Sequence, residues 1–338
     1  MTEYGLISLA DHLNDPVTGA KLTQSERIHQ LVDQAVLAED VGFFSFGLGE
    51  HHFSHYIMPA PELALAYMAA RTSRILLGTS VSLLANLDPV RFAEQLALLD
   101  ILTNGRAEVT FARGASEETI HAFGIETFDD LRPKFAESLR LVLRLLTEES
   151  VTWTGEYRSG FEDLTIQPRP LQKPHPEIWI GGGVSEISAK LAADTGMPLM
   201  LPSLFRWPID YADIVAFYRS EFEAANHDHV GKIGLPTYVH VAKNSQDAKR
   251  RWQPYLEHYR EFAMVIRGSH GRPVDYESLL AGPAICGSPA EVAERVAEIN
   301  DSLKLDRHLM LMDAGGLPWS LLAESIELLA SEVLPLVS

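Results

Sequence analysis

The segment Glu50-His51-His52 carries the residue types of proton-transfer chemistry, and it directly follows a short apolar run at residues 43–48. Histidine titrates near neutral pH, so either imidazole can give or take a proton or stabilise a developing anion. Glu50 can orient a neighbouring imidazole or lie against a bound ring. Adjacent histidines in a loop are also common as structural residues, so the segment alone leaves both interpretations open.

A metal site is a competing interpretation of the same segment. His51, His52 and His55, together with Glu50, offer nitrogen and oxygen ligands. However, adjacent residues on an extended segment point to opposite sides, and a zinc site needs three or four ligands that converge. Nothing like a second ligand cluster occurs elsewhere in the sequence. We therefore predict no metal site, and the residues alone do not choose between His51 and His52 as the catalytic candidate.

Arg113 is the first of two candidates for binding a phosphate group. It directly follows the apolar run 107–112 and precedes Gly114, whose lack of a side chain permits close approach of the backbone. A guanidinium presents several donors to one phosphate. A surface salt bridge is the alternative role for this arginine.

The second candidate is the run Gly181-Gly182-Gly183-Val184-Ser185, which follows the apolar residues 178–180 and opens a predicted helix. Backbone N–H groups at a helix start bind anions, and Ser185 and Ser188 add hydroxyl donors. A flexible turn with Ser185 as the helix N-cap is the alternative. The run is not the dinucleotide fingerprint GxGxxG. Combined with Arg113, it predicts one phosphate pocket of the size that a mononucleotide needs.

These candidates require a scaffold that brings several strand ends together. Apolar runs alternate with helical patterns along the chain, which predicts a parallel sheet in an α/β fold. Eight such units favour closure into a (β/α)8 TIM barrel, with an open doubly wound sheet plus an added domain as the alternative. In a barrel the active site forms at the carboxyl ends of the strands. The predicted strands are residues 4–10, 43–48, 75–82, 107–112, 178–180, 199–201, 237–242 and 308–312.

Two segments interrupt this alternation within the single barrel domain that we expect over residues 1–338. Residues 151–166 read as an inserted hairpin around Trp153-Thr154-Gly155. Residues 267–288 are rich in glycine and proline, and a structureless stretch of that length in a compact domain is either disordered or a functional lid.

The composition limits the classes of partner. The 338 residues carry a formal net charge of −18, and such a surface repels nucleic acid and anionic membranes. With Cys286 as the one cysteine, no disulfide can form within the chain, which suits a reducing cytoplasm. The N-terminus lacks the pattern of a signal peptide, and no stretch has the length of a membrane span. A cytoplasmic protein without nucleic-acid or membrane partners is expected.

In their order along the chain, a set of short motifs resembles the bacterial luciferase-like flavin-dependent monooxygenases. Each motif is short, but together they cover nearly the whole chain, which makes them specific for the superfamily and uninformative about the substrate. The motifs are Ala38-Glu39-Asp40-Val41-Gly42, Glu50-His51-His52-Phe53, Leu77-Gly78-Thr79-Ser80-Val81, Asp88-Pro89-Val90-Arg91, Leu99-Asp100, Asn104-Gly105-Arg106, Arg113-Gly114, Gln167-Pro168-Arg169-Pro170, Gln172-Lys173-Pro174-His175-Pro176, Ile178-Trp179-Ile180-Gly181-Gly182 and Cys286-Gly287-Ser288-Pro289.

The resemblance implies a (β/α)8 barrel, commonly dimeric, that works as an FMN-dependent monooxygenase. The partners that it implies are a separate flavin reductase that supplies reduced FMN, O2, a small organic substrate and a second copy of the chain. In such enzymes O2 adds to the flavin at C4a, and the C4a-peroxyflavin attacks the substrate. The resemblance also implies that residues 267–288 form a mobile lid that keeps water from the peroxide.

Site roles follow from the same resemblance. His51 matches the catalytic histidine, a proton donor or acceptor near the flavin peroxide, which leaves His52 a packing role. Glu50 would lie near the flavin ring. Ser80-Val81 matches a position with a non-proline cis peptide beneath the flavin. The remaining matched positions would bind the phosphate end of the cofactor: Arg113, Arg132 (with a one-residue offset), Gly183, Val184, Ser185 and Ser188.

One departure from the family pattern limits these expectations. Where luciferase has a reactive cysteine at the end of the fourth strand, this chain has Ala112, so light emission is not implied. Two other activities stay open: a deazaflavin-dependent hydride-transfer oxidoreductase of the same superfamily, and a non-catalytic flavin-binding subunit. The deazaflavin coenzyme has a longer acidic tail and would require more cationic residues at the mouth. His51 and the predicted lid argue against a non-catalytic role.

Overall fold

The computed structural model describes residues 2–114, 117–125, 127–182, 185–266 and 275–337. Within this part of the chain, nine strands form one parallel sheet in the order β10-β9-β11-β1-β2-β3-β4-β7-β8. A further pairing of β8 with the start of β9 closes eight of them into a barrel, and β10 pairs with the last residues of β9. The predicted (β/α)8 barrel is therefore confirmed, and the open doubly wound sheet is wrong.

The strands of this sheet are β1 (Glu3–Ser8), β2 (Ser45–Leu48), β3 (Leu76–Leu83), β4 (Ala107–Ala112), β7 (Glu177–Gly181), β8 (Leu199–Met200), β9 (Ile233–Val241), β10 (Ala284–Gly287) and β11 (Arg307–Leu311). The α-helices are α1 (Gln24–Val41), α2 (Pro61–Ala69), α3 (Pro89–Leu102), α4 (Glu117–Ala122), α5 (Phe128–Thr147), α6 (Glu186–Asp194), α7 (Ala212–Ala224), α8 (Ser245–Ile266), α9 (Tyr276–Ala281), α10 (Pro289–Leu303), α11 (Trp319–Leu328) and α12 (Leu334–Val337). Four shorter helical turns are η1 (Leu84–Asn86), η2 (Ser203–Phe205), η3 (Pro208–Tyr211) and the π-helical η4 (Leu329–Val333).

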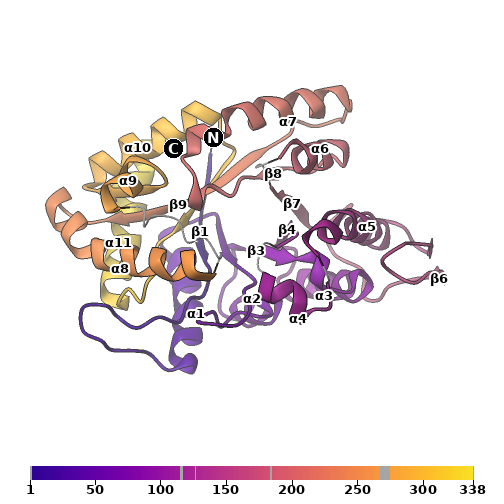
Figure 1. Ribbon diagram of the computed structural model, residues 1–338, viewed down its shortest axis with the longest axis horizontal. Helices are drawn as coiled ribbons and strands as arrows, with labels where there is room; N and C mark the ends of the chain where they lie inside the picture. Colours follow the sequence, from indigo (N-terminus) through magenta and orange to yellow (C-terminus); the bar gives the residue numbers. More distant parts are fainter. Residues whose placement is uncertain (1, 115–116, 126, 183–184, 267–274, 338) are drawn as a thin grey trace.

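Helices surround the strands, and the two ends of the chain lie side by side (Figure 1). The hydroxyl of Tyr4 in β1 donates to the carbonyl of Val337, 2.9 Å away, which ties the last turn to the first strand. The interior of the barrel is apolar because strands of a parallel sheet are covered on both faces. Every residue of β9, for example, is buried. None of the helices in the described residues is both long and apolar enough to cross a bilayer.

Local signals in the sequence set where the helices begin and end. Thr23 caps α1 through a capping box with Glu26, and Gly42 ends the helix with φ 96°, a conformation that glycine adopts without steric cost. Asp88 caps α3 by accepting from two backbone N–H groups, and Pro89 occupies the first helical position. The capping residues therefore set the residue at which each of these helices begins.

Several residues of the sequence motifs hold the barrel together at a distance from its mouth. Glu39 accepts hydrogen bonds from the backbone N–H groups of residues 73–75. Arg106 donates to the carbonyls of Thr72 and Ile75. Buried Asp100 accepts from the backbone and side-chain nitrogens of Gln172. The motifs that identify the superfamily are therefore partly connections between neighbouring strand–helix units.

The predicted hairpin at residues 151–166 is confirmed. It consists of β5 (Val151–Trp153) and β6 (Phe161–Leu164), which pair antiparallel and project from the side of the barrel (Figure 1). Its connecting turn is held by Glu137 of α5, whose carboxylate accepts from the backbone N–H groups of residues 156–158.

The expectation of one long structureless loop at residues 267–288 is wrong for its second part. Asp275 caps α9, and β10 pairs in parallel with β9. The apolar run Ala284-Ile285-Cys286 is too short to be recognised as a strand from the sequence. In the structure it pairs with the last residues of β9. Residues 267–274 lie outside the described residues, so the lid stays a prediction.

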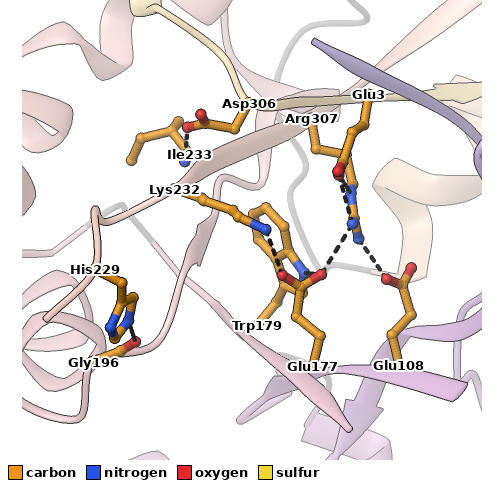
Figure 2. Close-up of polar contacts among 10 residues, drawn as sticks. All are labelled: Glu3, Glu108, Glu177, Trp179, Gly196, His229, Lys232, Ile233, Asp306 and Arg307. Carbon is orange, nitrogen blue, oxygen red and sulfur yellow. Dashed lines mark hydrogen bonds and ion pairs between the residues drawn. The ribbon is translucent and has the colours of Figure 1, made fainter. Parts of the chain in front are cut away.

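An ionic cluster closes the amino end of the barrel (Figure 2). Arg307, at the start of β11, donates to Glu3, Glu108 and Glu177, which come from the starts of three other strands. Its guanidinium also lies 4.6 Å from the ring centroid of Trp179. Arg307 is almost fully buried, and burial alone would lower its pKa, but the three carboxylates raise it. This end of a barrel serves stability rather than catalysis.

Candidate active site at the carboxyl end of the barrel

Glu50 follows β2 and connects three parts of the barrel mouth. Its backbone N–H donates to the carbonyl of Val81 (2.8 Å), and its carboxylate accepts from the backbone N–H of Leu83 (2.7 Å). The other carboxylate oxygen lies 2.8 Å from Nε2 of His52. The carboxylate therefore holds the end of β3 and the ring of His52, so the packing role predicted for His52 is incomplete.

The end of β3 is an irregular segment that lies beside Glu50. The peptide bond between Ser80 and Val81 is cis, as the resemblance implies, and the pairing register with β4 shifts between Ser80 and Ser82. The hydroxyl of Ser82 donates to Glu62 of α2, 2.8 Å away. Burial raises the pKa of the Glu62 carboxyl. Two carboxyl groups thus fix this segment, Glu50 from the loop after β2 and Glu62 from α2.

Space at this position is kept by a glycine. A Cβ on Gly49 would lie 2.8 Å from Cδ2 of Leu9 and 3.1 Å from the carbonyl oxygen of Ser80. Any larger residue would displace the β3 end or the end of β1. Because the strand ends meet so closely, the backbone itself forms the floor of the mouth.

His51 has a different environment from His52. Its ring stacks on Tyr56 at a centroid distance of 4.1 Å and an interplanar angle of 18°. The ring of His52 instead meets Phe123 edge-on at 4.7 Å, and the ring of His55 packs 5.7 Å from Phe262. The three imidazoles therefore have separate ring partners rather than a common centre.

Three of the six predicted phosphate residues line one cavity of about 310 Å³, the volume of roughly ten water molecules. Arg113 reaches it from the end of β4, Arg132 from α5 and Ser188 from α6. Burial and repulsion from Arg132 lower the pKa of Arg113. Two guanidiniums and a hydroxyl in one hollow are donors suited to an anion.

Close packing at the end of β7 shapes one side of this cavity. A Cβ on Gly182 would lie only 2.6 Å from Cβ of Ser188, so a side chain there would push α6 away. Ser185 is the N-cap residue of α6, which was the alternative to its predicted phosphate contact, and it is not one of the described residues that line the cavity, so that contact stays a prediction. Gly183 and Val184 lie outside the described residues, so their predicted contacts stay predictions.

The sequence interpretation missed a buried polar cluster at the carboxyl ends of β1 and β11. Arg27 of α1 donates to Asp313 (2.7 Å), and Asp11 lies 3.9 Å from the same guanidinium. Ser8 donates to Asp313 (2.6 Å). Burial raises the pKa of Asp11, an effect that Arg27 opposes and Asp313 reinforces. The available signal was position, because Asp11 and Asp313 each closely follow a strand.

Comparison with known proteins agrees with this arrangement. Sequences of the luciferase-like monooxygenase type match residues 2–305. The chain belongs to the luciferase-like monooxygenase family. Within the family, the oxygenase component of flavin-dependent trigonelline monooxygenase from Acinetobacter baylyi is 23% identical over 338 residues, covering 94% of this chain and 91% of that protein.

Other family members match over part of the chain. An uncharacterized Sinorhizobium fredii protein, y4vJ, is 34% identical over 164 residues, covering 48% of this chain and 46% of that protein. This chain thus matches about half the length of y4vJ. An F420-dependent glucose-6-phosphate dehydrogenase from Kineococcus radiotolerans is 38% identical over 163 residues, covering 46% of this chain and 47% of that protein.

Solved structures share the whole fold. The monooxygenase RslO1 from Streptomyces bottropensis has a TM-score of 0.88 and 28% identity, with 99% of both chains covered. The oxygenating constituent of 3,6-diketocamphane monooxygenase from Pseudomonas putida, solved with FMN, has a TM-score of 0.81 and 21% identity, covering 99% of this chain and 98% of that one. The likeness at 21% identity concerns the barrel alone.

Proposed function

We propose that this protein is an FMN-dependent monooxygenase that uses reduced FMN and O2 to oxygenate a small organic substrate. The observation that carries the proposal is the cavity lined by Arg113, Arg132 and Ser188. It lies at the same end of the barrel as His51. A net charge of −18 disfavours anions over most of the surface. A pair of arginines in a hollow therefore marks one place where a phosphate is favoured.

The residues present fit such a cofactor. Arg113, Arg132 and Ser188 would hold its phosphate, and Ser80, Val81 and Glu50 would lie under its ring. Reduced flavin, when bound, supplies the electrons that activate O2. Glu50 keeps the β3 floor in place through Leu83 and Val81. His51 would hold or deliver the proton that the reacting oxygen requires, a role for which an imidazole is suited.

Aromatic side chains suit an apolar substrate. Phe53 is 41% exposed and Phe123 is 40% exposed. They come from the segments after β2 and β4. The centroids of their rings lie 6.5 Å apart, and the ring of His52 packs against both. An apolar surface that stays partly open at the mouth can contact a small uncharged substrate.

A deazaflavin-dependent hydride-transfer enzyme is the second candidate, and the Kineococcus relative favours it. That coenzyme also carries phosphate, so the same cavity would serve. We prefer FMN because Arg113 and Arg132 would neutralise one phosphate group, whereas a long acidic tail requires further cations. Lys190 also lines the cavity, but it is already paired with Asp194 and Glu221. The third possibility is a non-catalytic flavin-binding subunit. We do not favour it, because such a subunit would not need a proton-transferring residue at the position of His51.

The same proposal includes two protein partners. A separate reductase would supply the reduced flavin. A second copy of the chain would cover the apolar face of α2 and α3, which contact each other. This face exposes large apolar side chains that a monomer rarely leaves in water: Leu63, Tyr67, Leu98, Ile101 and Leu102.

The role of His51 can be tested by substitution. We expect His51→Ala to bind reduced FMN as the native protein does but to lose at least about 100-fold in oxygenation, the usual size of a proton-transfer contribution. The measurement is substrate turnover with reductase supplied, alongside anaerobic titration with reduced FMN. His29→Ala, on the exposed side of α1, is the matched control and should change neither. Undiminished turnover in His51→Ala would remove the histidine from the mechanism.

A further inference from the structure

Tyr56 lies where it can fix the orientation of the His51 ring. The two rings are nearly parallel, with an interplanar angle of 18° and centroids 4.1 Å apart. The backbone N–H of His51 also donates to the carbonyl of Met58 (3.0 Å), so the loop containing Tyr56 folds back along His51. The imidazole is therefore held from two directions, by its backbone and by the face of its ring.

The position of Tyr56 is itself fixed through the backbone. Tyr56 forms an isolated antiparallel bridge with Asp11, which follows β1. On either side of it, the N–H of His12 donates to the carbonyl of His55 (2.6 Å), and the N–H of Ile57 donates to the carbonyl of Ala10 (3.2 Å). The loop after β2 is thereby attached to the loop after β1, directly at the mouth of the barrel.

The ring of Tyr56 has two further contacts on α8. Its hydroxyl lies 3.1 Å from the hydroxyl of Tyr259, and Phe262 packs at 5.1 Å with an interplanar angle of 53°. Tyr259 is fully buried and packs edge-on against Tyr238 of β9. Burial raises the pKa of Tyr259 well above its ordinary value, so its hydroxyl stays neutral. A rigid buried phenol thus sets where the ring of Tyr56 lies.

We propose that Tyr56 is a positioning residue for the proposed reaction: it sets the plane of the His51 imidazole by stacking, and Tyr259 fixes Tyr56 in turn. The inference rests on the proposed function of His51. An imidazole that transfers a proton must point one ring nitrogen at the reacting atom, and a misplacement of about 1 Å can cost about 100-fold in rate. The stacked tyrosine constrains this plane through the face of the imidazole.

Three variants separate the stack from the hydroxyl contact. Tyr56→Phe keeps the aromatic face and removes the hydroxyl. Tyr56→Leu removes the face while keeping an apolar side chain. Tyr259→Phe removes the hydroxyl partner alone. Tyr157→Leu, in the hairpin that projects from the side of the barrel, is the matched control for exchanging a tyrosine for leucine.

The first readout is the proton NMR shift of the His51 ring, measured without flavin in histidine-labelled protein and assigned with His51→Gln. An aromatic face 4.1 Å away moves that signal upfield. We expect the upfield position in the native protein, a similar partial loss in Tyr56→Phe and Tyr259→Phe, since each removes the same hydroxyl–hydroxyl contact, and complete loss in Tyr56→Leu. An upfield signal that persists in Tyr56→Leu would show that the stack does not exist in solution and would overturn the inference.

The second readout is oxygenation with reductase supplied. We expect kcat to fall about 10- to 100-fold in Tyr56→Leu with KM nearly unchanged, while Tyr56→Phe and Tyr157→Leu keep most of the native kcat. Equal kcat in Tyr56→Leu and Tyr56→Phe would refute the positioning role although the enzyme works. Native protein that fails to oxygenate with reduced FMN would instead refute the proposed function, and the two failures are therefore distinct.

Discussion

Replacing Arg113 by alanine tests the phosphate cavity by comparing two flavins that differ at one end. FMN carries the phosphate and riboflavin does not, so the variant should discriminate between them. A hydrogen bond to a charged group contributes about 1.5–3 kcal/mol, which corresponds to about 10- to 100-fold in Kd. We therefore expect Arg113→Ala to weaken reduced FMN by that factor and to leave the affinity for reduced riboflavin within about twofold.

A second arginine and a control arginine on the same helix allow the effect of the cavity to be separated from that of charge alone. Arg113 and Arg132 both line it, so Arg132→Ala should show the same selectivity. Arg140, exposed on the same helix as Arg132, provides a control of equal charge change that should affect neither flavin. The assay is anaerobic fluorescence titration at fixed ionic strength, because salt screens exposed charges. Equal weakening of FMN and riboflavin in Arg113→Ala would refute the assignment of the phosphate.

Three further predictions concern stability and assembly. Arg307→Met should lower the free energy of unfolding by about 3–5 kcal/mol in urea denaturation, because it leaves the buried Glu108 carboxylate without its partner; an unchanged midpoint would contradict this. Burial alone would raise the pKa of Glu39, but three backbone N–H donors lower it to about 2. Its folded pKa is below the ordinary 4.5, so the stabilisation that it provides is present above about pH 4.5 and is lost as the pH falls toward 2. Glu39→Gln should therefore have a lower free energy of unfolding than the native protein at pH 7, and the two free energies should converge below pH 4.5. If urea denaturation gives the same difference at every pH, the ionised carboxylate of Glu39 is not its cause. Leu98→Arg on α3 should shift the protein toward monomer in sedimentation velocity, and an unchanged sedimentation coefficient would argue against the proposed dimer face.

The barrel could be predicted from the sequence because the pattern that specifies it, a short apolar run followed by a helical pattern, is local and repeats along the chain. Runs such as 107–112 and 178–180 have the length and apolar character of buried parallel strands, and each is followed by a helical pattern. Strand β10 could not be found in this way. Its apolar run at residues 284–286 lies between glycines, and its partner β9 is more than 40 residues away in sequence, where only tertiary pairing decides the outcome.

The site was predictable in part. Arg113, Ser188 and Glu50 follow strands or begin helices, so the barrel rule places them at one end. The stack of Tyr56 on His51 could not be foreseen, since it depends on how the loop after β2 folds back on itself. Likewise, no residue pattern indicates that the carboxylate of Glu50 binds the ring of His52. Side-chain pairing within an irregular loop follows from backbone geometry, which periodicity does not reveal.

The motif residues themselves explain why the sequence indicates a superfamily and no substrate. Glu39, Arg106 and Asp100 bind backbone groups of neighbouring units, so they are required by the barrel whatever it oxidises. The residues that would contact a substrate, such as Phe53 and Phe123, lie in segments between the motifs or at their ends. Identity of the scaffold and choice of substrate are thus encoded in different parts of the chain.

The central claim is tested most directly by titrating the protein without oxygen with reduced FMN and, separately, with reduced deazaflavin, and then admitting O2 in the presence of a panel of small organic compounds. We predict saturable binding of reduced FMN that Arg113→Ala weakens, followed by O2 consumption that yields an oxygenated product and depends on His51. Binding of the deazaflavin alone, or of neither coenzyme, would contradict the proposed function.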